Sequence, residues 1–262
     1  TYPERMTSLY DYGPDPYRKE TGQNTAPAND MFDRIVAEAL GDVDGDGYAD
    51  IGLTRIEGDE VRFKICYGDA EGWGASLEGV PQDRVTTVSL FPISEHNGLD
   101  YVYVADSMDW DGDGRADLVF SAGEGHYPEP APPIGVVLDA ARLRGAELGL
   151  DDMRRLADVN IASVDPRKTR YGARAIGDVN GDGFGDLFVG FAPEWRIVYG
   201  GPDPKDIALD APQPGQTTEV LRNADTFGGV LGAYPIGDVN GDGIDDLLFN
   251  PQGQREFVVI YG

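Results

Sequence analysis

An acidic pattern of nine residues recurs four times along the chain, and this repetition restricts the possible folds more than any other feature. The copies begin at Asp42, Asp109, Asp178 and Asp238, so they lie about 60 to 70 residues apart. Repeats of this length are typical of architectures in which one small unit is copied along the chain. We therefore expect a single domain over residues 1–262. Its four units are expected at about residues 31–91, 99–164, 171–221 and 227–262.

Short β-branched and aromatic runs surround each acidic pattern and are bounded by Gly, Pro and Asp, which indicates strands joined by turns. One run leads into the pattern, a second follows it at once, a third tends to end in Tyr-Gly, and a fourth comes next. Four strands per unit predict an all-β fold, a β-propeller of four-stranded blades. Each acidic loop is expected between the first and second strands of its blade. The fourth strands are expected at 85–91, 158–164 and 217–221.

The last unit stops after its third strand, so the ring needs a strand from elsewhere. The only strand-like run before the first unit is at about residues 5–10, and its pairing with 257–261 closes a ring of four blades. A fragment of a larger ring, or half of a ring made by two chains, is the alternative to this monomer. Between the second unit's third and fourth strands, residues 138–157 are expected to form a loop with at most a short helix at 151–156. Cys66, in an apolar run, is expected to be a buried structural thiol.

The acidic loops are predicted to bind about four Ca²⁺ ions, one per repeat. Ca²⁺ takes about six to eight oxygen ligands, and each loop offers side-chain oxygens at positions one, three, five and nine, with a backbone carbonyl at position seven. Glycines at positions four and six allow the tight turn. The expected ligands are Asp42, Asp44, Asp46, Tyr48 and Asp50 in the first loop, Asp109, Asp111, Asp113, Arg115 and Asp117 in the second, Asp178, Asn180, Asp182, Phe184 and Asp186 in the third, and Asp238, Asn240, Asp242, Ile244 and Asp246 in the fourth.

Two other interpretations of these loops fit less well. An EF-hand needs a glutamate at position twelve and flanking helices, but the residues found there are apolar and lie in strand-like runs. They are Leu53, Phe120, Val189 and Phe249. Solvated acidic turns would explain one such loop but not four in matching context. Mg²⁺ holds its water and prefers strict octahedral geometry, so Ca²⁺ fits better.

Residues 175–190 and 235–249, which contain Ile-Gly-Asp-Val-Asn-Gly-Asp-Gly, resemble the FG-GAP repeats of integrin α-subunit propellers and their bacterial relatives. The Phe-Gly element of that family is matched by Phe227-Gly228 and, as Tyr-Gly, by Tyr171-Gly172. The first and second units depart from this element, and integrin propellers have seven blades. The resemblance implies structural Ca²⁺ sites within the blades and a binding or adhesion scaffold whose ligand docks elsewhere on the ring.

The net charge of −26 argues against nucleic acid and anionic membranes as partners. No apolar stretch is long enough to span a bilayer. Calcium sites on surface modules often need Ca²⁺ at about 10⁻⁴ to 10⁻³ M, which predicts a secreted protein in an extracellular or cell-envelope setting.

Catalytic patterns are scarce in this chain. The two histidines, His96 and His126, lie in different units, and no nucleophile elbow or phosphate-binding loop occurs. We therefore expect a non-enzymatic module that binds a glycan or protein. The alternatives are a purely structural domain of a larger envelope protein and, further off, a polysaccharide hydrolase or lyase. Aromatic residues in expected loops are the candidate ligand contacts, unless they pack between blades. They are Trp73, Tyr127 and Trp195.

Overall fold

The computed structural model describes residues 36–57, 60–73, 79–92, 106–121, 134–163, 171–191, 194–222, 233–249 and 257–262. In this part the protein is mostly β-strand, arranged in four sheets, with one short α-helix. The all-β prediction is therefore confirmed. The expected closing strand at 5–10 and the expected strand at 101–105 lie outside the described residues.

Each sheet contains the strands of one repeat. The first sheet has β1 (Val36–Gly41), β2 (Asp50–Glu57), β3 (Glu60–Cys66) and β4 (Val85–Pro92). The second has β5 (Asp106–Met108), β6 (Asp117–Phe120), β7 (Ile134–Val137) and β9 (Val159–Ala162). The third has β10 (Tyr171–Gly177), β11 (Asp186–Phe191), β12 (Glu194–Val198) and β14 (Thr217–Arg222). The fourth has β15 (Ala233–Gly237), β16 (Asp246–Phe249) and β17 (Val258–Ile260).

Strand order within the sheets follows the expected pattern. In every sheet the first two strands pair antiparallel on either side of the acidic loop, and the second pairs with the third. The first three sheets add the expected fourth strand, antiparallel to the third. The acidic loops are thus hairpin connections at equivalent places, as the sequence predicts.

Two short strands were not expected. β8 (Glu147–Gly149) pairs parallel with β4, and β13 (Ile207–Ala208) pairs parallel with β9. Each comes from the connection between the third and fourth strands of one unit and extends the sheet of the preceding unit. The segment 138–157 therefore contains a strand besides the short helix that was expected at 151–156, which is α1 (Leu150–Leu156). A three-residue strand leaves little periodicity in a sequence, which is why this feature was missed.

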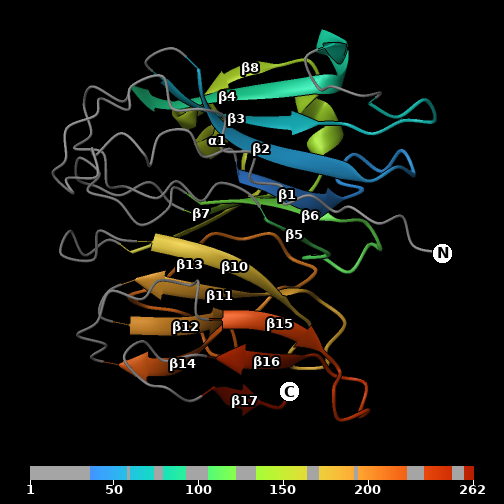
Figure 1. The fold of residues 1–262 in the computed structure, drawn as a ribbon. Helices are drawn as coiled ribbons and strands as arrows, with labels where there is room; N and C mark the ends of the chain where they lie inside the picture. Colours follow the sequence, from blue (N-terminus) through green and yellow to red (C-terminus); the bar gives the residue numbers. More distant parts are fainter. Residues whose placement is uncertain are drawn as a thin grey trace, which may run out of the picture.

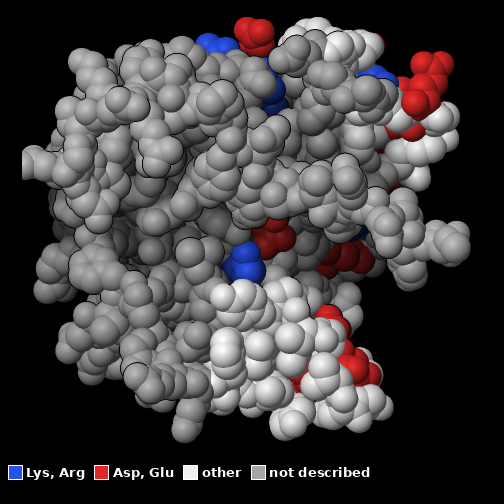
Figure 2. Space-filling model, in the orientation of Figure 1, with Lys and Arg blue, Asp and Glu red and all other residues white. Residues whose placement is uncertain are grey.

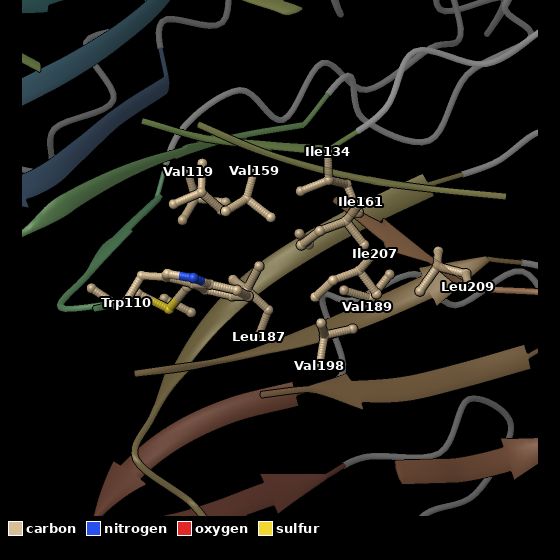
Figure 3. Packing of buried hydrophobic residues seen from close by; sticks show 14 residues of the cluster. Trp110, Val119, Ile134, Val159, Ile161, Leu187, Val189, Val198, Ile207 and Leu209 are labelled. Carbon is tan, nitrogen blue, oxygen red and sulfur yellow. The ribbon is translucent and has the colours of Figure 1, made fainter. Parts of the chain in front are cut away.

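The hydrophobic core consists of layers between neighbouring sheets. Alternate residues of β6 show the principle, because Leu118 and Phe120 belong to the cluster with the first sheet and Val119 to the cluster with the third. The layer between the second and third sheets includes Trp110 and Leu187 (Figure 3). Fully burying one such aliphatic or aromatic side chain contributes about 1.5–3 kcal/mol, so the layers hold the sheets in their order. Cys66 is buried, as expected.

The four sheets follow one another from the top to the bottom of Figure 1, with the first and fourth at opposite ends of the described row. The described sheets stack through apolar layers, and the described strands do not show the closed four-bladed ring that was predicted. No helix in the described part of the chain is long and apolar enough to span a membrane.

Candidate metal-binding loops

The backbone of the four loops takes the tight form that the glycines permit. Gly112 and Gly114, at positions four and six of the second loop, have φ angles of 77° and 87°, and the equivalent glycines of the other loops are also at positive φ. Residues with a Cβ rarely adopt this conformation, which explains why glycine occurs at positions four and six of every loop. Figure 2 shows acidic side chains gathered along the right-hand side of the molecule, the side on which the β1–β2 and β15–β16 turns lie in Figure 1.

The aspartate at position one organises each loop by accepting hydrogen bonds from its backbone. In the third loop, Asp178 Oδ1 accepts from the amides of Gly181 at 2.7 Å and Asp182 at 3.1 Å, and Oδ2 accepts from Gly183 at 2.8 Å. The fourth loop repeats all three bonds. Backbone amides therefore wrap the loop around its first carboxylate.

The aspartate at position nine is buried and ties the loop to the rest of its sheet. Its Oδ2 accepts from the amide of position two in every loop, as in Asp186 with Val179 at 2.9 Å. In three units Oδ1 accepts from the glycine of the Tyr-Gly pair that ends the third strand, at 2.8 to 3.1 Å. These glycines are Gly68, Gly200 and Gly262. We call this bond the Tyr-Gly latch.

The latch explains why glycine ends the third strand. A Cβ on Gly200 would lie 2.3 Å from the carbonyl oxygen of Gly185, and one on Gly68 would lie 2.5 Å from that of Ala49. Only glycine allows the amide this close approach. In the second unit Asp139 occupies the equivalent place, and Asp117 Oδ1 is buried without a hydrogen-bond partner.

Burial makes the position-nine carboxylates costly to ionise. Burial, together with the neighbouring carboxylates of Asp111, Asp113 and Asp109, raises the pKa of Asp117 to about 7. Burial likewise raises the pKa of Asp186 to about 7 and that of Asp50 to about 6, against the opposing effect of their backbone hydrogen bonds. A cation in the loop would offset this cost.

The second loop gives the clearest test of whether a cation fits. Ligand oxygens of Asp109, Asp111 and Asp117 lie within 4.8 Å of one another, and Asp109 Oδ1 is buried without a partner, as is Asp117 Oδ1. Buried carboxylate oxygens without partners are rare because desolvation is expensive. A bound hard cation would satisfy both oxygens, so these residues fit Ca²⁺.

The other loops offer variations on this ligand set. Asp42, Asp44 and Asp50 form a second carboxylate group with ligand oxygens within 4.8 Å. The third and fourth loops have an amide at position three. The Nδ2 of Asn180 donates to Asp182 at 2.9 Å, and that of Asn240 donates to Asp242 at 2.7 Å, which leaves each amide oxygen directed within the loop.

Neighbouring loops also contact one another, which the sequence analysis did not anticipate. The Phe184 ring lies against Gly112 of the preceding loop, and the Ile244 side chain lies against Gly181 in the same way. The amide of Gly185 donates to the carbonyl of Asp109 at 2.6 Å, and that of Asp245 donates to Asp178 at 3.0 Å. Position seven thus has a packing role besides the carbonyl ligand that was predicted there. The loops therefore connect strands within one sheet and also contact the loop of the neighbouring sheet.

The three aromatic candidates for ligand contact have different surroundings. Trp195 is 8% exposed and packs between the third and fourth sheets, with ring centroids 5.2 Å from Phe188 and 5.7 Å from Phe249. Its ring therefore packs in the hydrophobic core between sheets, which was the alternative to a ligand contact. Trp73 is half-buried and its Nε1 donates to the carbonyl of Tyr67 at 3.1 Å. Tyr127 lies outside the described residues.

One further residue at the loops had no signal in the local sequence. Arg144 of the second unit contacts Asp44 and Asp46, two expected ligands of the first loop. The residues lie about 100 positions apart in the chain, so only the packing of the first two sheets brings them together.

No protein-family model matches this chain, and no curated protein sequence matches it.

Proposed function

We propose that the protein is a calcium-stabilised repeat module in which each acidic loop binds one Ca²⁺. The observation that carries this proposal is the pair of buried oxygens without partners, Asp109 Oδ1 and Asp117 Oδ1, beside the Asp111 carboxylate. Ca²⁺ prefers such oxygen-only sites and tolerates irregular geometry, whereas Mg²⁺ needs a strict octahedron. The ions have a structural role, because the loops join strands within each sheet and lie against the loops of neighbouring sheets.

Calorimetric titration of the metal-free protein with Ca²⁺ tests this proposal. We expect about four ions per chain and weaker binding of Mg²⁺. Asp111→Asn should weaken one site by removing a carboxylate from the second loop. Asp203→Asn is the matched control, because Asp203 is 78% exposed, lies outside the loops and forms an ion pair with exposed Lys205. Failure of Ca²⁺ to bind, or an equal effect of the two variants, would refute the proposal.

The arrangement of the sheets supports a β-propeller as the architecture. Each unit forms an antiparallel sheet with its acidic loop at an equivalent place, and apolar layers separate consecutive sheets. This is the organisation of propeller blades, and it agrees with the resemblance of the loops to FG-GAP repeats. In solution, small-angle scattering of the calcium-loaded protein distinguishes a closed ring from an open row.

A binding or adhesion role for a glycan or a protein, outside the cell or in its envelope, follows from the same proposal. A rigid stack of sheets held by Ca²⁺ presents connecting loops on a stable scaffold, which suits recognition. Screening glycan and protein arrays with Ca²⁺ and with EGTA tests this role. Capture that depends on Ca²⁺ supports a binding module. A purely structural domain would instead gain stability from Ca²⁺ and capture nothing, and turnover of a polysaccharide would show an enzyme.

A further inference from the structure

Arg144 connects the second unit to the first acidic loop. It follows η5 (Ala140–Leu143) and precedes β8, in the segment that extends the first sheet. Its guanidinium Nη1 donates to the carboxylate of Asp44 and, at 3.2 Å, to Asp46 Oδ2. These two carboxylates are positions three and five of the first loop. The Asp44 side chain is fully buried, so the contact is shielded from water on the loop side.

A buried network holds Arg144 in this place. The guanidinium lies over the ring of Tyr67, with its central carbon 5.1 Å from the ring centroid. The Tyr67 hydroxyl donates to the carbonyl of Ala140 at 3.1 Å and lies 3.0 Å from Thr86 Oγ1. Thr86 Oγ1 in turn donates to the carbonyl of Leu143. Both ends of η5 are thereby attached to the first sheet, and the arginine that follows it is directed at the loop.

The second loop has no equivalent contact among the described residues. β13 joins the second sheet as β8 joins the first, and the strand register places Asp203 at the position of Arg144. Asp203 is acidic and pairs with Lys205. Arg115 does pair with Asp113 inside the second loop, but its side chain is 49% exposed, so solvent screens the pair. Among the described residues, the first loop thus receives an arginine from the neighbouring unit and the second loop does not.

We propose that Arg144 is a built-in counter-cation of the first loop, which makes this loop the weakest of the four for Ca²⁺. The inference rests on the proposed function, namely that the loops bind Ca²⁺. An ion that uses the oxygens of Asp44 and Asp46 must displace the guanidinium or share them with it. Displacement breaks charge-assisted hydrogen bonds and lowers the apparent affinity. The same contact keeps the first loop closed at calcium concentrations that leave the site empty.

A titration with Ca²⁺ alone, followed by NMR of the loop glycine amides, tests this inference for each site. Gly45 and Gly47 report on the first loop, and Gly181 and Gly183 report on the third. In the wild type, the first-loop signals should shift at higher Ca²⁺ than the third-loop signals. Arg144→Gln should lower the first-loop midpoint by about tenfold or more and leave the third unchanged, because a hydrogen bond to a charged group is worth at least an order of magnitude in an equilibrium constant.

Arg142→Gln is the matched control. It removes the same charge only two residues away, within η5, but Arg142 pairs with Asp158 at 2.5 Å instead of contacting a loop. If it lowers the first-loop midpoint as much as Arg144→Gln does, the effect is one of net charge and the inference is wrong. An unchanged or raised midpoint in Arg144→Gln also overturns it. Arg144→Lys keeps the charge but loses the planar fork of the guanidinium. Its first-loop midpoint should lie between those of the wild type and Arg144→Gln, and it replaces Arg144→Gln in the test if that variant does not fold. Absence of any response in all four loops would instead refute the proposed function.

Discussion

The second and third loops share one sequence pattern but differ in how their position-nine aspartates are held. In the third loop Asp186 accepts from Val179 on one oxygen and from Gly200 on the other. In the second loop Asp117 accepts from Trp110, and its other oxygen is buried with no partner among the residues that the structure describes. The difference arises outside the loop, at the end of the third strand, where Gly200 is replaced by Asp139.

This comparison shows that an acidic loop does not act alone. The Tyr-Gly latch satisfies a carboxylate oxygen from within the protein, so a latched loop has hydrogen bonds that remain when the metal leaves. The unlatched loop leaves the same oxygen to the metal. We infer that the second loop depends more on Ca²⁺ than the third.

The largest effect is expected when Ca²⁺ is removed. Binding to the folded state alone stabilises it by about 2.7 kcal/mol per site when free Ca²⁺ is about 100-fold above Kd, so a chelator should lower the unfolding free energy by several kcal/mol. Amide hydrogen exchange should increase more in the β5–β6 hairpin than in the β10–β11 hairpin. Denaturation with and without EGTA, followed by exchange measured by mass spectrometry, checks both statements. Equal loss of protection in the two hairpins would contradict the role given to the latch.

Removing a latch while keeping the metal ligands should have the next largest effect. Gly200→Ala places a Cβ 2.3 Å from a backbone oxygen, so the strand end must shift and its bond to Asp186 weakens. We expect a loss of about 2–4 kcal/mol in unfolding free energy. Gly201→Ala is the control, because a Cβ there meets nothing within 4 Å. Urea denaturation in excess Ca²⁺ measures both variants, and similar losses in the two would argue against the latch.

Much of this arrangement was predictable from the sequence because it depends on residues close together in the chain. The hairpin position of each acidic loop follows from the runs on either side of it, and α1 follows from local composition at 151–156. The Tyr-Gly ending was noticed as a pattern, but its reason is a contact across the sheet between Gly68 and Asp50. A repeated pair of residues can thus mark a hydrogen bond that the sequence does not reveal.

The features that were missed depend on the packing of one unit against another. β8 and β13 are strands only because an edge of the preceding sheet is available to them. Arg144 reaches Asp44 for the same reason. Trp195 could be a surface aromatic or a core aromatic on its local sequence, and the rings of Phe188 and Phe249 decide between these two places. Such contacts can be predicted only when the order and spacing of the sheets are known.

A smaller effect should separate the position-nine aspartates in the metal-free protein. Asp186→Asn loses one of two backbone hydrogen bonds, because an amide has one acceptor oxygen and its NH₂ group would face a second amide. We expect a cost of about 1–3 kcal/mol. Asp117→Asn keeps its single bond to Trp110, so its cost should be near zero at about pH 4, where the folded state binds the Asp117 proton. Thermal denaturation of the two variants after metal removal measures their losses of stability. Equal losses would mean that the Asp117 and Asp186 oxygens do not differ in their hydrogen bonds.

The last effect, the smallest when expressed per pH unit, concerns pH in the same metal-free protein. Burial raises the pKa of Asp117 from 3.8 to about 7, so between these values the folded state binds more protons than the unfolded state. Stability should therefore fall as pH rises from about 4 to about 7 and stay level above that range. Asp117→Asn removes this proton and should lower the slope by at most about 1.4 kcal/mol per pH unit, while Asp186 and Asp50, whose pKa values burial also raises, keep part of the dependence. Unfolding free energies measured at several pH values test this, and a variant profile as steep as that of the wild type would show that Asp117 does not carry the dependence.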